Sequence, residues 1–435
     1  MNKSKDCLEF IRMVLVFYLR GVFLTPHFLR KYLTMLTCHI YNVYGVFNER
    51  VERLKKVCSI ILVLNMMLLN LNFSVASAQE LSNLTAKSAI VIEAATGKVL
   101  YEKDANSRRY PASTTKMMTL IVALEYGKME DTVTVSKNAV DTEGSSLGLD
   151  EGEKIKLSDL LYGMMLVSGN DATVAVAEHI AGSVDKFAQL MTKKAIEIGA
   201  QNTSFVNSSG LPDPEHYTTA ADLAKIAAYG YKNPMFAKIV NTKEKLIPWG
   251  SRAYMRDLNN ENRMLSLYDG GNGVKTGYTD IAGRCLVSAA KRNGVQLIAV
   301  VLDSEYMWND SIALLDYGFK NIQPMNLFKK KDIVKTVHVV SGKKDVIQLV
   351  TDGDIDIPLV EGEQDKFKTL IDVPERVYAP VGKGDPVGKV KIMYDGKEVA
   401  SANLIAKESV EKRSFFSTVY QTLSIAVSYI KNTLA

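Results

Sequence analysis

The hydrophobic pattern divides the chain into stretches of different period. Short apolar runs at 89–92 and 99–101 flank the turn Ala95-Thr96-Gly97, which predicts a β-hairpin. Three further strand-like runs follow much later, at 273–278, 285–290 and 295–301. Asn293-Gly294 joins the last two of these runs. Because Asn-Gly between two apolar runs is a strong hairpin signal, the sequence predicts a sheet that is at least partly antiparallel.

Between these strand regions the apolar positions recur at helical spacing. Pro111 precedes a segment from Ser113 to Tyr126 that is apolar on nearly all sides, which predicts a buried helix. Four more helices are expected, at 158–167 with Ser158 as its cap, at 171–181, between Ser183 as its cap and Gly199, and at 219–229. The pattern therefore predicts an α+β domain over 80–322, in which a helical block is inserted into an antiparallel sheet.

Short strands dominate the region 329–406. They are expected at 334–340, 346–350, 355–360, 389–394 and 398–405. Asp395-Gly396 joins the last two as a hairpin. We therefore expect a second, small all-β domain over 329–406.

Apolar side chains return to helical spacing in the tail, 409–435, where Lys412 and Arg413 precede them. An amphipathic helix with neighbouring basic residues is typical of a segment that lies on an anionic membrane surface. The alternative interpretation is that this helix packs on the all-β domain.

A leader with the features of a signal peptide occupies 50–78. Four basic residues precede an apolar run from Val57 to Leu71, and the small residues Ala76-Ser77-Ala78 follow. We expect cleavage after Ala78, because the run is shorter than the about 20 apolar residues of a membrane span, although a retained anchor is the alternative. Secretory signals stand at the N-terminus, so residues 1–49 are interpreted as a non-native or mis-assigned extension.

Composition narrows the classes of function. The 435 residues are 47% hydrophobic and 23% charged, which suffices for two or three domains with cores of their own. The net charge of +5 comes from residues 1–78, since residues 79–435 are close to neutral and offer no basic surface for nucleic acid. Beyond the leader, Cys285 and three scattered histidines show no metal-ligand spacing. We expect no metal and no other cofactor.

The first candidate for chemistry is the pair Ser113 and Lys116, three residues apart at the start of the predicted buried helix. A serine hydroxyl needs a base, and a lysine can be that base only if burial or a nearby cation lowers its pKa. An apolar helix N-terminus favours both conditions. The spacing alone is weak, because Ser-x-x-Lys occurs five more times, at Ser183/Lys186, Ser288/Lys291, Ser341/Lys344, Ser409/Lys412 and Ser428/Lys431.

Two polar triplets make Ser113 the strongest of these candidates. Ser168-Gly169-Asn170 falls in a break between two predicted helices, and Lys275-Thr276-Gly277 falls on a predicted strand. Each triplet alone is adequately explained as a helix cap or as a solvated strand lysine. Together they predict one site with these roles: Ser113 as nucleophile, Lys116 as base, Ser168 as proton relay to the leaving amine, Asn170 as a holder of a substrate amide, Lys275 and Thr276 as holders of a terminal carboxylate, and Gly277 as a point of close backbone approach.

The set Ser-x-x-Lys, Ser-x-Asn and Lys-Thr-Gly resembles the signature of the penicillin-recognising serine enzymes. The segments 111–117, 166–172 and 273–279 resemble more closely the low-molecular-mass penicillin-binding proteins that act as D-alanyl-D-alanine carboxypeptidases. This resemblance covers almost everything after residue 80. It implies a β-lactamase/transpeptidase-like domain, then a β domain and an amphipathic C-terminal anchor.

The resemblance also implies an acyl-enzyme on Ser113, with an oxyanion hole formed by the backbone N–H groups of Ser113 and Tyr278. Two positions depart from the family pattern. Asn272 stands where the family often has Asp, and Glu261 stands where Thr is common. These departures concern recognition of the substrate's terminal residue rather than the reaction.

Three alternatives remain open. A β-lactamase would share the motifs, but none of the glutamates between Ser168 and Lys275 is followed by Asn at the fourth position, as the commonest serine class requires. An α/β-hydrolase elbow is formally matched at Gly144–Gly148, although a turn-like segment follows it instead of a helix. A wall-binding module with an unused catalytic set is the third alternative.

The sequence thus predicts an exported serine-type D-alanyl-D-alanine carboxypeptidase that removes the terminal D-Ala from peptidoglycan stem peptides. Penicillin and other β-lactams are expected to inhibit it by acylating Ser113. The tail over 409–435 is expected to hold it at the outer face of the bacterial cell membrane. No nucleic acid is expected as a partner.

Overall fold

The computed structural model describes residues 81, 83–250, 252–359, 362–414 and the positions 423, 424 and 427. The predicted extension over 1–49, the predicted signal peptide over 50–78 and most of the predicted C-terminal helix over 409–435 lie outside these residues. In the described part, no helix is both long enough and apolar enough to cross a membrane.

A five-stranded antiparallel sheet forms the base of the first domain. Its strands are β1 (Ser88–Glu93), β2 (Val99–Lys103), β7 (Gly271–Thr279), β8 (Gly283–Arg292) and β9 (Val295–Leu302), in the spatial order β2-β1-β9-β8-β7. Both predicted hairpins are confirmed, and Asn293 and Gly294 take the positive φ values that their two-residue turn requires. β7 forms one edge of the sheet.

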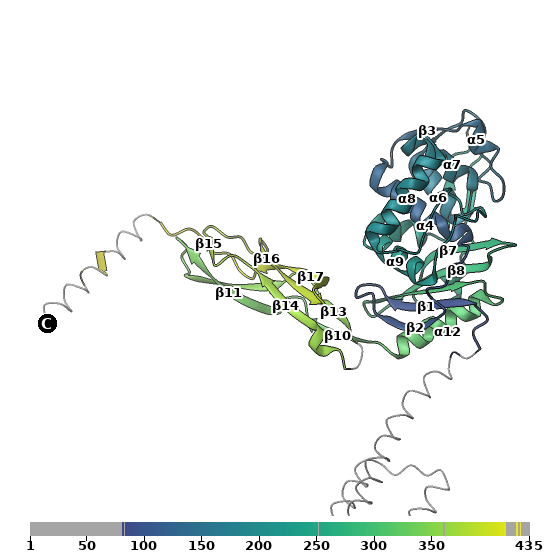
Figure 1. Cartoon of the computed structure of the whole chain (residues 1–435). Coiled ribbons are helices and arrows are strands. Elements are labelled where there is room, and N and C mark those ends of the chain that lie inside the picture. Colours follow the sequence, from purple (N-terminus) through teal and green to yellow (C-terminus); the bar gives the residue numbers. More distant parts are fainter. Residues whose placement is uncertain are drawn as a thin grey trace, which may run out of the picture. The chain divides into compact units, whose positions relative to one another are not determined.

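The two faces of the sheet pack against different helices (Figure 1). Ile90 and Ile92 join the core under the helical block, whereas the alternate residues Ala89 and Val91 join the core under α12 (Met307–Lys320). This alternation follows from the two-residue period of a strand. α12 has no counterpart among the predicted helices, and it covers the face of the sheet opposite the helical block.

The helical block lies between β2 and β7 in the chain. Its helices are η1 (Ala112–Thr115), α4 (Lys116–Tyr126), α5 (Lys137–Val140), α6 (Leu157–Leu166), α7 (Asn170–Ala181), α8 (Val184–Ile198), α9 (Ala220–Gly230), α10 (Pro234–Val240) and α11 (Met264–Leu267). Two small hairpins border it, β3 (Thr132–Thr134) with β4 (Lys154–Lys156) and β5 (Glu244–Ile247) with β6 (Arg256–Asn259). α4 is buried along most of its length, as its sequence predicts.

One helix start differs from the prediction. The Ser158 side chain does not cap α6, because that helix begins at Leu157, directly after β4. The N–H groups of Leu157 and Ser158 donate instead to the carbonyls of Asp131 and Met129. The free donors of the first turn are therefore satisfied by a loop distant in sequence.

In its described residues, the second domain contains only strands and one short turn of 3-10 helix. It contains β10 (Gln323–Phe328), β11 (Ile333–Val340), β12 (Val346–Thr351), β13 (Ile355–Leu359), η2 (Gln364–Lys366), β14 (Phe367–Asp372), β15 (Arg376–Tyr378), β16 (Pro386–Tyr394) and β17 (Lys397–Ala406). Six of these strands form one sheet, in the order β14-β16-β17-β12-β11-β15. The predicted all-β character is confirmed, and β10, β14 and β15 are strands that the sequence analysis did not predict.

Candidate active site

Ser113 is the one solvent-accessible residue in an otherwise buried stretch. Every residue from Pro111 to Leu120 is buried except Ser113, which lies in η1 just before α4. Two glycines allow the chain to pack this tightly. A Cβ at Gly210 would lie 1.8 Å from the Ala112 carbonyl oxygen, and a Cβ at Gly277 would lie 2.9 Å from the Ser113 nitrogen. Gly277 therefore lets its strand lie close to the segment that carries Ser113.

The Lys116 amine connects the first two motifs. Its Nζ lies 2.8 Å from Ser113 Oγ, 2.7 Å from Asn170 Oδ1 and 2.8 Å from the Ser209 carbonyl oxygen. An amide oxygen and a backbone carbonyl can only accept hydrogen bonds. A neutral amine has two protons and one lone pair, so it gives its protons to these two acceptors. Its lone pair is then left for the Ser113 hydroxyl.

The environment of Lys116 favours that neutral form. Burial is the largest cause that lowers the pKa of Lys116 well below its usual value, and the positive charge of Lys275 lowers it further. Glu261 and Asp171 act in the opposite direction. A lysine can act as a base when burial or a nearby cation lowers its pKa, and both causes are present at Lys116.

Asn170 is the first residue of α7, and both ends of its side-chain amide are engaged. Its Oδ1 accepts from Lys116, and its Nδ2 donates to the Glu143 carbonyl at 2.6 Å. The Asn170 backbone nitrogen donates to the Ser145 carbonyl at 2.7 Å. These bonds hold the amide where it orients the lysine amine, so the geometry supports a positioning role for Asn170 beside the predicted contact with substrate.

Asp171 holds the loop that the sequence matched to a nucleophile elbow. One of its carboxylate oxygens accepts from the Ser146 hydroxyl at 2.6 Å, and the other accepts from the Leu147 nitrogen at 2.8 Å. Neither a strand nor a helix adjoins residues 144–148. The segment is a loop beside the site, and the hydrolase elbow is excluded by its geometry.

Ser168 is buried, with a positive φ of 62°, in the break between α6 and α7. Within the described residues its hydroxyl makes no hydrogen bond, so no hydrogen bond joins it to Ser113 or Lys116. The predicted relay role of Ser168 therefore stays a prediction.

Lys275 and Thr276 lie side by side on the edge strand β7. Lys275 Nζ donates to Thr276 Oγ1 at 3.2 Å, and the Lys275 side chain is 1% exposed. Burial lowers the pKa of Lys275 to about 8, while Glu261 partly opposes that shift. At neutral pH this lysine is still mostly charged. Tyr278, two residues further along the strand, is 60% exposed.

Several groups at the site have no signature in the sequence. The carbonyls of Ser209 and Glu143 are backbone atoms, which any residue type supplies. His216 is one of the three histidines without metal-ligand spacing in the sequence. Its Nε2 lies 2.9 Å from Thr115 Oγ1, and burial lowers the pKa of His216 to about 4. Because its Nδ1 accepts from the Val206 nitrogen, the neutral ring donates from Nε2 and braces η1.

Cys285 and the remaining candidates give no sign of other chemistry. Burial raises the pKa of the Cys285 thiol to about 12, so it is a buried thiol rather than a nucleophile. Among the residues with described positions, no group of three or more His, Cys, Asp or Glu side chains is arranged to hold a metal ion.

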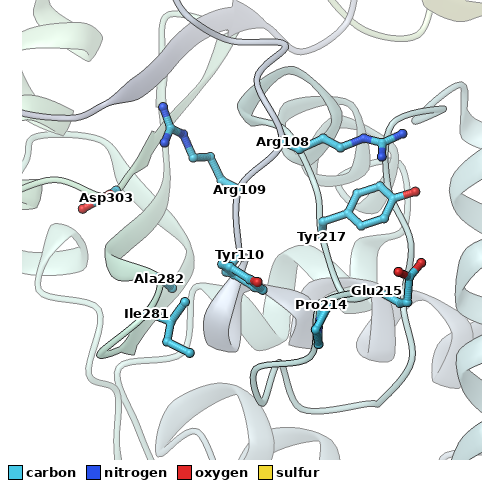
Figure 2. Close-up of a pocket in the computed structure, with 9 residues that line it drawn as sticks. All are labelled: Arg108, Arg109, Tyr110, Pro214, Glu215, Tyr217, Ile281, Ala282 and Asp303. Atoms are coloured by element: carbon cyan, nitrogen blue, oxygen red, sulfur yellow. The ribbon is translucent and has the colours of Figure 1, made fainter.

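A separate pocket lies beside the segment that leads into η1 (Figure 2). Arg108, Arg109 and Tyr110 line it together with residues from 214–217 and 281–282. The Arg108 guanidinium stacks on the Tyr217 ring, 4.2 Å from its centroid. No predicted site residue lines this pocket, so it is distinct from the Ser113 centre.

Comparison with known proteins gives two family matches. Residues 74–306 match the model described as D-alanyl-D-alanine carboxypeptidase, and residues 323–412 match the C-terminal domain of penicillin-binding protein 5. The D-alanyl-D-alanine carboxypeptidase DacF of Bacillus subtilis is 37% identical over 354 residues, which cover 78% of this chain and 89% of that protein. The enzyme DacC of Escherichia coli, with the same description, is 31% identical and covers 80% and 90%.

Solved structures agree with these matches. Penicillin binding protein 5 from Haemophilus influenzae superposes with a TM-score of 0.53 at 31% identity, covering 76% of this chain and 98% of that one. The carboxypeptidase DacD of Francisella tularensis superposes with a TM-score of 0.54 at 31% identity, covering 77% and 95%. Both likenesses extend over most of the described residues.

Proposed function

The chain belongs to the D-alanyl-D-alanine carboxypeptidase family of serine peptidases, and from this premise we propose that Ser113 removes the terminal D-alanine of peptidoglycan stem peptides. The protein is a serine-type carboxypeptidase of the penicillin-binding class. The observation that carries the proposal is the placement of one buried amine, Lys116 Nζ, between the Ser113 hydroxyl and the Asn170 amide.

The proposed acylation uses Lys116 as the base. The neutral amine takes the hydroxyl proton while Ser113 Oγ forms a bond to the carbonyl carbon of the penultimate D-alanine. The backbone N–H groups of Ser113 and Tyr278 stabilise the negative charge that develops on the carbonyl oxygen. As the peptide bond breaks, the proton passes through Ser168 to the amine of the departing D-alanine. Water then hydrolyses the ester and restores the hydroxyl.

Recognition of the terminal carboxylate is assigned to β7. Lys275 supplies a positive charge and Thr276 a hydroxyl donor, and their side chains lie within 3.2 Å of each other. A Cβ at Gly277 would lie 2.9 Å from the Ser113 nitrogen, and this closeness of β7 to the segment of Ser113 supports the proposal that the Ser113 and Tyr278 N–H groups act together. A β-lactam carries a carboxylate beside its reactive carbonyl, so it fits the same groups and inhibits by forming a long-lived ester.

Release of D-alanine tests the proposal. The purified full chain is incubated with diacetyl-Lys-D-Ala-D-Ala, and the products are measured by mass spectrometry beside Ser113→Ala. We expect release from the parent chain only. Fluorescent penicillin should label the parent and not the variant. A label that survives Ser113→Ala would refute the assignment of the nucleophile, labelling without D-alanine release would favour a wall-binding module, and rapid loss of label would favour a β-lactamase.

We further propose that the chain is exported and held on the outer face of the cell membrane. The basic, apolar and small-residue order over 50–78 supports export with cleavage after Ala78, and the amphipathic pattern over 409–435 supports peripheral attachment. N-terminal mass spectrometry of the mature protein tests the first part, because peptides from 1–49 would contradict it. Membrane fractionation with and without residues 409–435 tests the second part.

A further inference from the structure

Glu261 occupies a fixed position beside the proposed carboxylate-binding groups. It lies between β6 and α11, and its backbone nitrogen donates to the Leu166 carbonyl at 3.1 Å. Its neighbours are also anchored, since Asn260 Oδ1 accepts from the Asn262 nitrogen and Asn260 Nδ2 donates to the Thr242 carbonyl. The backbone that carries the Glu261 side chain is therefore held in place.

The Glu261 carboxylate contacts both groups of the proposed anion site. Its Oε2 lies 3.8 Å from Lys275 Nζ and 3.4 Å from Thr276 Oγ1. Lys275 donates to Thr276, and Thr276 in turn donates to Glu261. A threonine hydroxyl has one proton to give. While Glu261 accepts that proton, the hydroxyl cannot donate to a second carboxylate.

We propose that Glu261 is a specificity-determining residue that competes with the substrate's terminal carboxylate for Lys275 and Thr276. This inference rests on the proposed function of that pair. The Glu261 side chain is 48% exposed, so it can turn toward solvent when substrate enters. Each binding event then replaces an internal carboxylate with an external one and places two like charges near each other. Both effects weaken the binding of peptides that end in a free carboxylate.

Glu261 also supports the charge of Lys275, and this effect has the opposite sign. Its carboxylate raises the pKa of Lys275 against the lowering by burial. Removing it would let the lysine lose its proton at lower pH and so weaken anion binding in alkaline solution. At pH 6 Lys275 is charged with or without Glu261, so measurements at this pH report only the competition between Glu261 and the substrate carboxylate.

Neutral substitution at this position tests the competition directly. At pH 6, Glu261→Gln and Glu261→Thr should lower KM for diacetyl-Lys-D-Ala-D-Ala about three- to tenfold, the range expected for a half-exposed ion pair that is no longer in the way. The C-terminal amide of the same peptide lacks the competing charge. Measured as an inhibitor of that reaction, it should bind the parent and both variants equally.

A matched variant controls for the overall charge. Asp257→Asn removes one negative charge from the exposed side of β6, four residues away, without touching Lys275 or Thr276. It should leave KM unchanged. Circular dichroism and thermal melting of all three variants check that the fold is intact, and the threonine variant keeps the test valid if glutamine perturbs the loop.

The outcomes separate this inference from the proposed function. Lower KM for the acid with unchanged inhibition by the amide supports the competition. Unchanged or higher KM in both variants overturns it, as does an equal gain for acid and amide or an equal gain in Asp257→Asn. If the parent chain released no D-alanine, the proposed function would fail and this inference with it. If the parent does release D-alanine, only the role of Glu261 is at stake.

Discussion

Lys116 Nζ lies 2.8 Å from Ser113 Oγ, and the two other groups that it contacts can only accept hydrogen bonds. The amine therefore has one direction in which its lone pair can point. Burial lowers the pKa of Lys116 and so favours the neutral form, and the two acceptors orient the amine, so the same surroundings act on protonation and on geometry.

Replacing Lys116 by arginine should strongly slow acylation although the two side chains are similar in length. A guanidinium keeps its proton throughout the accessible pH range, so it cannot accept the one from Ser113. We expect the rate of penicillin acylation to fall by about 10²–10⁴-fold, the usual contribution of a general base. Stopped-flow measurement with fluorescent penicillin gives the rate, and Lys186→Arg on α8 is the control that should change nothing. Near-normal acylation in Lys116→Arg would show that another group is the base.

The pH profile of kcat/KM should be bell-shaped. On the acid side activity rises with pH as Lys116 loses its proton, since only the neutral amine is a base. On the alkaline side activity falls near pH 8, because the pKa of Lys275 is about 8 and its loss of charge weakens carboxylate binding. Lys275→Arg should move the alkaline limb to higher pH, since the guanidinium stays charged. An alkaline limb that does not move would assign it to another group.

Asn170→Asp should displace the acid limb. The new carboxylate would lie where Asn170 Oδ1 now lies, 2.7 Å from Lys116 Nζ, and an opposite charge at that distance favours the ammonium. The pKa of Lys116 should rise and acylation at pH 7 should fall at least about tenfold. Activity should recover partly as pH increases, which distinguishes an electrostatic effect from a misfolded loop. A loss that is equal at every pH would contradict this explanation.

Gly210→Ala should destabilise the protein far more than Gly152→Ala. Both glycines have positive φ, 95° and 78°, so both substitutions incur the strain of the left-handed region, about 1 kcal/mol. A Cβ at Gly210 would also meet the Ala112 carbonyl, whereas nothing lies within 4 Å of one at Gly152. We expect a difference of more than about 2 kcal/mol in the free energy of unfolding, measured with urea. Acylation should also fall in Gly210→Ala only, because η1 would be displaced.

The buried ion pair of Glu153 and Arg256 should make the first domain sensitive to acid. Both side chains are 2% exposed, with two hydrogen bonds of 2.7 Å between them. Burial raises the pKa of Glu153, but the hydrogen bonds from Arg256 and from the backbone outweigh it and the pKa is lowered. The stabilisation is complete above the unfolded pKa of about 4.5 and is lost as the pH falls through the lower folded value.

Glu153→Gln tests this interpretation at neutral pH. Removing one partner of a buried pair leaves the Arg256 charge uncompensated, so we expect a loss of about 3–5 kcal/mol in the free energy of unfolding. The difference between parent and variant should shrink as the pH falls below the unfolded pKa of about 4.5 towards the lower pKa of the folded state. A difference that stays constant with pH would mean that packing, and not charge, is responsible.

Local patterns were sufficient for much of the fold. The hairpin at Asn293-Gly294 and the cap at Ser183 depend on residues adjacent in the chain, and both were predicted. β10 was not predicted, because Pro324 and Asn326 interrupt its apolar alternation while its partner β13 lies about thirty residues away. The Ser158 cap was wrong for a related reason, since the groups that satisfy the start of α6 come from a distant loop.

The site divides in the same way. The type and order of the side chains identified Ser113, Lys116 and the two triplets as candidates for one site. Nothing local indicated that the Ser209 carbonyl would complete the surroundings of the amine, or that Glu261 would contact Lys275. Those contacts depend on how the 207–210 and 260–262 loops fold over the helical block. The order of side chains therefore identifies the candidate reacting groups, whereas the contacts that surround them are visible only in the tertiary structure.

β7 has a partner strand on one side only, because it ends the sheet. Among the described residues, the backbone of 275–279 makes no hydrogen bond outside the sheet, so half of its donors and acceptors face outward beside Ser113. A peptide that lies along this edge can form hydrogen bonds with these groups and add a sixth strand to the sheet while it is bound. An extended backbone matches such a row of groups, so we expect linear peptides to bind along β7 better than tightly cyclised or helical ones.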